Sequence, residues 1–169
     1  MHCRRAVSGI AEQDAALRGS PGFPHGRGRV QGHLVRVVLD SNVLRAAFAT
    51  HGLCEAIVLA CIDRHDLILW DAIAEEVRRH LAGKFKLPRD RVRRNVEFLR
   101  ENATFVVPRE VPASACRDSA DCAILGTAVA GRADCIVTGD ADLLVLGRYE
   151  HVRILSPRDF HERLRSRRR

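Results

Sequence analysis

Four acidic side chains in separate segments could do chemistry together if the fold brought them to one place. Asp40 ends the apolar run VRVVLD, and Asp140 follows the apolar residues of CIVTGDADLL. Glu76 lies in AIAEEVRRHL, and Asp121 lies in RDSADCAILG. Carboxylate oxygens without Cys or His partners favour Mg²⁺ or Mn²⁺ as the bound ion. Such an ion lowers the pKa of a bound water and offsets the charge of a phosphate, so the four acids predict a site for phosphodiester hydrolysis.

The segment DAIAEEVRRHL contains two neighbouring glutamates, and helical geometry separates them. Successive residues of a helix are turned by about 100°, which places Glu75 about 160° from both Ile73 and Val77. Glu76 lies only about 60° from Ile73 and can flank the buried face. We therefore expect Glu75 to pair with one of the two arginines that follow Val77, and Glu76 to join the site. A similar surface ion pair is the alternative for Glu76.

The helix predicted over residues 119–130 carries another acid in an unusual position. Asp121 shares one face with the apolar residues four and seven positions later, although charged side chains rarely start a core-facing stripe. The alternative is a local role, with Asp118 as the N-cap and Asp121 as its capping-box partner. For Asp40 the alternative is also an N-cap, of the helix that follows it, and Asn42 could take that place instead.

Strands and helices are expected to alternate along the chain. Runs of aliphatic and β-branched residues predict strands at residues 35–39, 67–70, 104–107, 135–138 and 152–155, of which the first is suited to a buried strand. The expected helices are residues 42–64 with a break near His51, a helix containing Ile73 to Leu81, a basic helix after Pro88, residues 119–130 and residues 157–164. This alternation predicts an α/β protein, a three-layer α/β/α sandwich with a central, mostly parallel sheet.

The predicted sheet explains how distant acids could meet. In an open parallel sheet, the carboxyl ends of the strands form one edge, and ligands bind there. Asp40 and Asp140 follow the first and fourth predicted strands, so both should emerge at this edge. Repulsion among converging carboxylates would be costly without a cation, which supports the prediction of a metal ion.

The chain is expected to form one domain with two extensions. It has 169 residues, of which 46% are apolar, and this suffices for one hydrophobic core. Residues 1–33 contain half of the twelve glycines and no hydrophobic period, which predicts either a disordered extension or an initiation codon assigned too far upstream. Residues 34–164 should form the domain, and residues 165–169 a basic tail.

The net charge of +7 indicates an anionic partner, but the position of the charge matters more than its total. Residues 34–160 are neutral overall, yet basic side chains gather from Arg78 to Arg94. The candidates for contacts to RNA phosphates are Arg89, Arg91, Arg93 and Arg94. A solvated helix face is the alternative for this stretch.

The six cysteines predict free, mostly buried thiols, because disulfide scaffolds are small and rich in loops. No Cys-x-x-Cys pair occurs, which argues against structural zinc. No apolar run approaches the roughly 18 residues of a membrane span, and no secretory signal follows the first arginines. We therefore expect a cytoplasmic protein without a membrane span.

Several segments in the same order resemble the PIN-domain family: VVLDSNVL, AIAEEVRRHL, RDSADCAILGTAVAGRADCIVTGDADLL and VRILSPRDF. The likeness extends from Val35 to Leu164 and is greatest to the bacterial and archaeal branch of toxins from toxin and antitoxin pairs. The resemblance implies a PIN-like fold and a metal-dependent endoribonuclease using Mg²⁺ or Mn²⁺. It also implies an RNA substrate, a homodimer and a cognate antitoxin that blocks or distorts the site.

The resemblance assigns the family's four acids, as catalytic residues and metal ligands, to the set chosen above. That set is Asp40, Glu76, Asp121 and Asp140. Auxiliary positions of the family fall on Asn42, Asp118, Thr138 and Asp142. Two residues depart from the common pattern, since Ser41 stands where Thr is commoner and Gly126 where Ala is usual, and neither is a proposed ligand.

Other families with related beginnings fit less well. A haloacid-dehalogenase-like phosphatase needs a second Asp two residues after the first, where this chain has Asn42. A phospho-receiver domain needs a late lysine, and the only lysines are Lys84 and Lys86. The alternative from a different functional class is a non-catalytic PIN-like module that binds RNA or a protein partner, and the four retained acids weigh against it.

Overall fold

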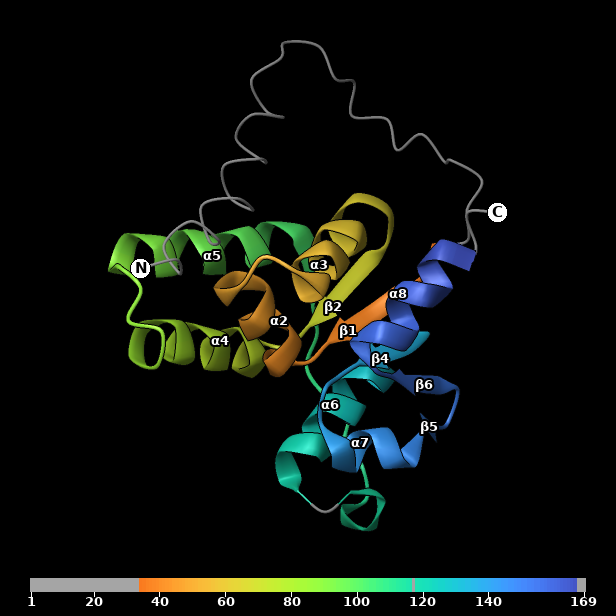
Figure 1. Ribbon diagram of the computed structural model, residues 1–169. Coiled ribbons are helices and arrows are strands. Elements are labelled where there is room, and N and C mark those ends of the chain that lie inside the picture. The colour runs from red at the N-terminus through yellow and green to blue at the C-terminus, as the bar shows by residue number, and fades with distance from the viewer. Residues whose placement is uncertain (1–33, 117, 167–169) are drawn as a thin grey trace.

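The computed structural model describes residues 34–116 and 118–166, and its centre is a six-stranded sheet (Figure 1). The strands are β1 (Arg36–Leu39), β2 (Asp66–Leu69), β3 (Ala103–Phe105), β4 (Cys135–Val137), β5 (Arg148–Tyr149) and β6 (Val152–Leu155). Their order across the sheet is β3-β2-β1-β4-β6-β5. All neighbouring pairs are parallel except β5 with β6. The mostly parallel sheet predicted from the sequence is therefore confirmed.

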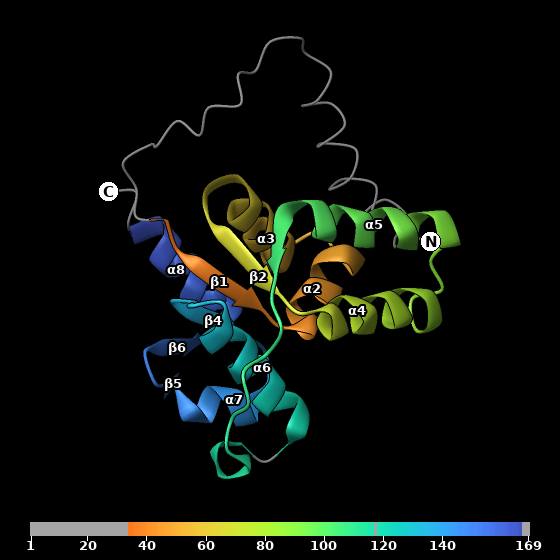
Figure 2. The ribbon, with the colours of Figure 1, turned by 180° about the vertical axis from the view of Figure 1, so that it is seen from behind.

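Helices cover both faces of this sheet. They are α2 (Ser41–Ala49), α3 (Leu53–Arg64), α4 (Asp71–Gly83), α5 (Arg89–Asn102), α6 (Ser119–Ala130), α7 (Ala141–Leu146) and α8 (Pro157–Ser166), with a short 3₁₀ turn η1 (Ala113–Ala115). Helices α3 and α8 contact each other on one face, and α6 and α7 lie on the other (Figures 1 and 2). This arrangement is the expected three-layer α/β/α sandwich.

The sheet has a topological switch point between β1 and β4. From β1 the chain proceeds to β2 and β3 on one side, and it then crosses back through α6 to β4 on the other side. Right-handed crossovers place the connecting helices of the two halves on opposite faces. The connections that leave the carboxyl ends of the neighbouring strands β1 and β4 therefore run to opposite faces of the sheet, and open α/β sheets bind ligands at such a point.

The core explains why these segments became strands. The last three residues of β1 and of β2 are buried aliphatic residues, and all three residues of β4 are buried. A parallel sheet covered on both faces requires such continuous apolar runs, because both sides of each strand meet helices. Large, completely buried side chains such as Leu39, Ile68 and Ile136 come from these strands.

Glycine at position 126 has a packing reason. A Cβ atom built on Gly126 would collide with the carbonyl oxygen of Arg109, and the N–H of Arg109 donates to the Gly126 carbonyl at 3.1 Å. The segment after β3 therefore packs directly against α6. Glycine lowers the helix propensity of α6, but its missing Cβ atom allows this close approach.

The structure corrects the expectation for two cysteines. Cys116 and Cys122 form a disulfide, with their Cα atoms 5.8 Å apart, whereas the sequence analysis predicted free thiols. The argument against a disulfide scaffold concerned the whole chain, but here two cysteines six positions apart in the sequence lie within bonding range. Cys54, Cys61 and Cys135 keep their thiols outside any disulfide, as expected, and of these Cys61 and Cys135 are buried while Cys54 is partly buried.

Three small elements were not predicted, one of which is the 3₁₀ turn η1. Helix α7 and strand β5 lie where the sequence analysis had no element, and α8 continues to Ser166 rather than ending at Leu164. The predicted extension at residues 1–33 and the last three residues of the predicted basic tail lie outside the described residues. Within the described ranges, no single helix is long and apolar enough to cross a membrane, and α2 with α3 would pass only as a pair bent by 108°.

Candidate active site

The first and fourth predicted strands end side by side. Leu39 of β1 pairs with Val137 of β4, and the N–H of Asp40 donates to the Val137 carbonyl at 3.1 Å. Asp40 follows β1 directly, and Asp140 follows β4 after two intervening residues. The expectation that both acids emerge at the same edge of the sheet is therefore met, at the switch point.

Asp40 is buried and held in one orientation. The residue is only 6% exposed. One carboxylate oxygen, Oδ2, accepts from Thr138 Oγ1 at 2.7 Å and from Asn42 Nδ2 at 2.7 Å. Burial raises the pKa of the Asp40 carboxyl group above its ordinary value, the hydrogen bonds from Thr138 and Ser41 oppose this rise, and the charge of Glu76 adds to it. Asp40 occupies the N-cap position of α2, but its side chain makes no capping hydrogen bond to the helix backbone. The side chains of Thr138, which follows β4, and of Asn42, in α2, orient it instead.

The same hydrogen bonds tie the ends of β1 and β4 together. Asn42 Oδ1 accepts from the N–H of Gly139 at 3.1 Å, while its Nδ2 donates to Asp40. Thr138 Oγ1 accepts from the N–H of Asp140 at 2.9 Å and donates its own proton to Asp40. Both polar ends of Asn42 and both functions of the Thr138 hydroxyl are thus used within the site, which fixes how these side chains are oriented.

Asp121 lies in the first turn of α6, across from these strand ends. Burial raises the pKa of its carboxyl group, and the negative charges of nearby acids raise it further. In decreasing order of effect, these acids are Asp140, Asp118, Asp40 and Asp142. Four carboxylates, from the residues after β1 and β4 and from the starts of α6 and α7, are therefore close enough for their charges to act on Asp121.

Two of these acids also stabilise helix ends. Asp118 is the N-cap of α6, and its Oδ1 accepts from the N–H of Ala120 at 3.1 Å, which confirms the local role considered for it. Asp140 is the N-cap of α7, and its Oδ1 accepts from the N–H of Asp142 at 2.8 Å. Asp140 therefore has a structural role that sequence reasoning did not assign, and its other oxygen, Oδ2, does not take part in this cap.

The two glutamates of α4 separate as predicted. Glu75 is exposed and accepts from Arg78 Nη2 at 2.5 Å and from Arg78 Nε at 2.7 Å. Glu76 has a side chain 38% exposed and lies on the α2 side, where Arg45 Nη1 is 3.8 Å from its Oε1. His80 Nδ1 is 4.0 Å from the same oxygen. Glu76 therefore lies at the margin of the acidic region, close enough to Asp40 to affect it.

Arg45 is a residue of the site that the sequence analysis missed. It lies on α2, one helical turn beyond Asn42, and it is the cation beside Glu76. The i, i+3 and i, i+4 spacing from Asn42 and Ser41 was a usable signal, because residues at this spacing share one face of a helix. A positive charge at the margin of an acidic site is suited to contact a phosphate.

A divalent metal ion fits the donor chemistry of this region. All the side chains that converge are carboxylates, and their mutual repulsion is the situation that a hard cation relieves. Among the described residues, no three His, Cys, Asp or Glu side chains already converge tightly enough to form a metal cage. Mg²⁺ needs only one or two protein carboxylates, since it keeps several waters, so the residues present are compatible with it.

The predicted arginine cluster is not part of this region. Arg89, Arg91, Arg93 and Arg94 occupy the first half of α5, which runs antiparallel to α4 on the far side from the strand ends (Figures 1 and 2). Arg94 Nη2 lies 3.0 Å from Asp90 Oδ2, and Arg93 Nε lies 3.9 Å from Glu97 Oε1. Half of the cluster is therefore paired with acids of its own helix.

Comparisons with known proteins agree with this fold. A chain in the crystal structure of VapBC2 from Rickettsia felis, bound to a DNA fragment from their promoter, superposes with a TM-score of 0.52 at 10% sequence identity. The match covers 72% of this chain and 98% of that one, and at this identity it concerns the fold alone. Among curated proteins there is no match. Residues 36–142 match the profile of the PIN domain, which is more than half of the sequence, so the chain belongs to the PIN-domain family.

Proposed function

We propose that this chain is a metal-dependent endoribonuclease that hydrolyses phosphodiester bonds within RNA. PIN domains are typically nucleases and generally use divalent metal ions. The observation that supports this activity here is the set of five carboxylates around the switch point, in which the charges of the other four raise the pKa of Asp121 beyond the effect of burial. Repulsion among carboxylates at a ligand-binding edge destabilises the metal-free protein, and a bound cation relieves this repulsion.

Asp40, Glu76, Asp121 and Asp140 are the proposed ligands of Mg²⁺ or Mn²⁺. When bound, the ion supplies positive charge for the phosphate oxygens and acidifies a water that can attack phosphorus. Thr138 and Asn42 both donate to Oδ2 of Asp40, and Oδ1 accepts from neither of these two side chains.

The other acids and the nearby cation have auxiliary roles in this proposal. Asp118 and Asp142 add negative charge at the rim, and without a cation this charge would repel the RNA that must approach. Arg45, beside Glu76, is placed to contact a phosphate of the bound strand.

A circular single-stranded RNA tests the activity, because only internal cleavage can open it. With Mg²⁺ or Mn²⁺ the purified protein should linearise the circle, and a chelator should stop the reaction. Asp40→Asn should reduce the rate by at least about a thousandfold, since it removes a ligand charge with almost no change in shape. Asp121→Asn and Asp140→Asn should behave alike. Glu75→Gln is the matched control and should retain the parent rate, because Glu75 faces outward and pairs with Arg78.

Two results would count against the nuclease. Cleavage by Asp40→Asn at the parent rate, with equal metal, would show that the acidic region is not the active site. If the parent cuts no RNA but parent and variant bind it equally well, the non-catalytic binding module is the better description. Circular dichroism of each variant separates loss of activity from loss of folding.

The likeness to VapBC2 supports a further proposal about partners. We propose that the chain is the toxin of a toxin and antitoxin pair, acts on cytoplasmic RNA and forms a homodimer. Expression of the parent should arrest growth, expression of Asp40→Asn should not, and co-expression of a small protein from the adjoining reading frame should restore growth. Analytical ultracentrifugation gives the oligomeric state. Growth arrest by Asp40→Asn equal to that of the parent would separate toxicity from the acidic site.

A further inference from the structure

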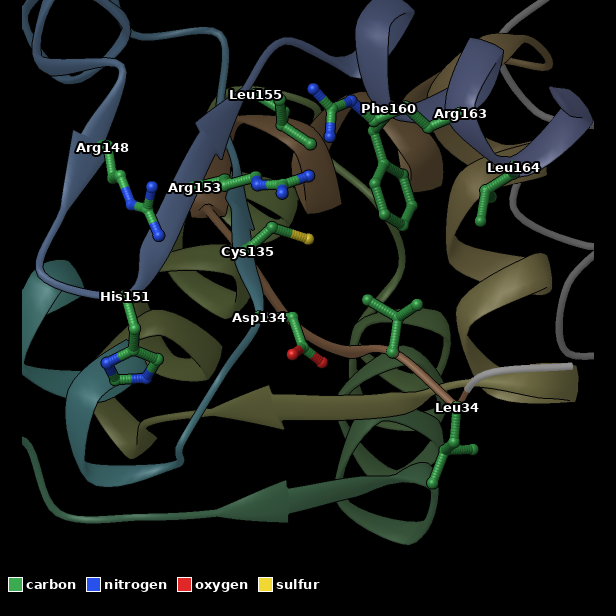
Figure 3. A pocket seen from close by; sticks show the side chains of 11 residues that line it. Leu34, Asp134, Cys135, Arg148, His151, Arg153, Leu155, Phe160, Arg163 and Leu164 are labelled. Carbon is green, nitrogen blue, oxygen red and sulfur yellow. The ribbon is translucent and has the colours of Figure 1, made fainter. Parts of the chain in front are cut away.

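A cavity of about 300 Å³ lies at the opposite edge of the sheet from the carboxylates (Figure 3). It is bounded by the amino ends of β1 and β4, by the β5–β6 hairpin and by α8, whereas Asp40 and Asp140 follow the carboxyl ends of their strands. Its apolar lining includes Val35, Cys135, Leu155 and Phe160. Ligand pockets for small molecules begin at about this size and combine an apolar lining with a few charged groups.

Three arginines and a histidine line the same cavity. Arg148 and Arg153 are directly opposite each other in the antiparallel pair of β5 with β6, and Arg163 approaches from α8 (Figure 3). Like charges placed directly opposite on neighbouring strands destabilise a hairpin. His151, at the turn between the two strands, adds a further donor.

Acidic side chains do not neutralise this cluster. Asp134 is the one acid among the lining residues, and its Oδ2 accepts from the backbone N–H of Arg36 at 2.8 Å. Within the described residues, none of the three arginines lies within 4.0 Å of a carboxylate oxygen. Arg148 Nε donates to the backbone carbonyl of Glu150 at 3.0 Å. The cavity therefore combines an apolar interior with positive charge that no carboxylate of the described residues offsets, and a bound anion would offset this charge.

We infer that this cavity binds a phosphomonoester with an apolar or aromatic body, of the size of a nucleoside monophosphate. The phosphate would accept from Arg148, Arg153 and Arg163, since guanidinium groups donate two parallel hydrogen bonds to phosphate oxygens. The body would lie against the apolar lining near Leu155 and Phe160. A volume of about 300 Å³ admits one nucleotide and excludes an RNA strand from the interior.

Isothermal titration calorimetry with AMP tests the inference on the full chain, in EDTA and without inorganic phosphate. EDTA removes the divalent ions, so the carboxylate site cannot hold the phosphate. AMP should bind with a stoichiometry of one, and adenosine and ribose 5-phosphate should each bind at least about tenfold more weakly, because each lacks one half of the ligand. Arg153→Gln should weaken AMP binding at least about tenfold. Arg158→Gln, on α8 but outside the lining, is the matched control and should bind AMP like the parent.

Thermal unfolding gives a second readout, and its comparison without ligand does not depend on the affinity for AMP. Without ligand, Arg153→Gln should melt at the same temperature as the parent or higher, because one of two opposed charges is gone. At one fixed concentration, AMP should then raise the melting temperature of Arg153→Gln less than that of the parent and of Arg158→Gln. Inorganic phosphate binding as tightly as AMP, or an Arg153→Gln variant that binds AMP like the parent, would overturn the inference. Binding of RNA oligonucleotides at these arginines without binding of AMP would overturn it too.

Discussion

Asp40 shows at the scale of one residue how a buried carboxylate can be kept ready for chemistry. Burial alone favours the protonated form, and the hydroxyl of Thr138 and the amide of Asn42 favour the charged form by donating to it. The backbone of the neighbouring strand fixes both donors in turn, through Gly139 and Asp140. The charge and orientation of Asp40 are therefore properties of the junction between two strands.

Asp121 allows a prediction about pH at the same scale. Its pKa is raised in the folded protein, so the folded chain holds a proton that the unfolded chain releases between the ordinary value near 3.8 and the raised one. The stabilising effect is complete below that ordinary value and is lost as the pH rises through the raised value. Without metal, Asp121→Asn should therefore melt at a higher temperature than the parent at pH 7, and the difference should shrink towards pH 4.

Glu75→Gln is the control for this series, because the sign of its shift is opposite. The hydrogen bond from Arg78 lowers the pKa of Glu75, so removing its charge should not raise the melting temperature at pH 7. Melting curves of parent and both variants across this pH range give the comparison. A melting temperature of Asp121→Asn equal to that of the parent at pH 7 would show that repulsion at this position is unimportant.

Individual site residues differed in how far the sequence could predict them. Asp40 and Asp140 follow apolar runs, so the rule for parallel sheets was enough to bring them together. Arg45 was missed because a basic residue within an amphipathic helix looks like ordinary surface until the neighbouring helix is placed against it. The cap formed by Asp140 was missed for a related reason, since α7 has only six residues and shows no full helical period.

Helix α5 carries the basic cluster, and the role of this cluster in RNA binding remains a prediction. We expect replacement of Arg89, Arg91, Arg93 and Arg94 by Ser to weaken RNA binding without regard to sequence. Each lost phosphate contact should reduce the slope of log affinity against log salt by about one unit. The pairs of Arg93 and Arg94 with acids of α5 should make their share smaller than that of Arg89.

Fluorescence anisotropy at several salt concentrations measures this slope. An Asp40→Asn background prevents cleavage during the titration, and Arg158→Ser outside the cluster serves as the control. If the fourfold variant keeps both the affinity and the slope of its Asp40→Asn parent, α5 is an ordinary solvated helix face.

The start of α6 shows what pattern reasoning could not provide at the scale of elements. The helix itself was predicted, with Asp118 at its N-cap, because caps and stripes are local features of a sequence. The bond between Cys116 and Cys122 depends on the path of the chain immediately before the helix, which no periodicity describes. Asp118 and Asp121 lie between these two cysteines in the sequence. The disulfide therefore constrains the part of the chain that carries two of the five acids.

At the scale of the whole molecule, alternation of strands and helices predicted the layers, whereas the strand order, with its switch point between β1 and β4, was not predicted. The edge pairing of β5 with β6 escaped prediction, because β5 has two residues and directly follows α7. The cavity lined by the β5–β6 hairpin and α8 was not predicted either, because Arg148 and Arg153 are opposite each other only once the hairpin has formed.

The last prediction concerns the boundary of the domain, which we propose to lie at residue 34. The buried apolar residues that form the described core run from Val35 to Phe160, and every proposed ligand of the metal ion lies within this range. A chain that begins at Leu34 should therefore melt within a few degrees of the full chain. It should also keep a rise in melting temperature on addition of Mn²⁺, because an ion that binds only the folded state stabilises it by mass action. Asp40→Asn in the shortened chain is the control and should lose most of that rise. A fall of about ten degrees or more on truncation would mean that the first 33 residues contribute to the folded core, since a change of about 2 kcal/mol shifts the melting temperature of a domain of this size by roughly that amount.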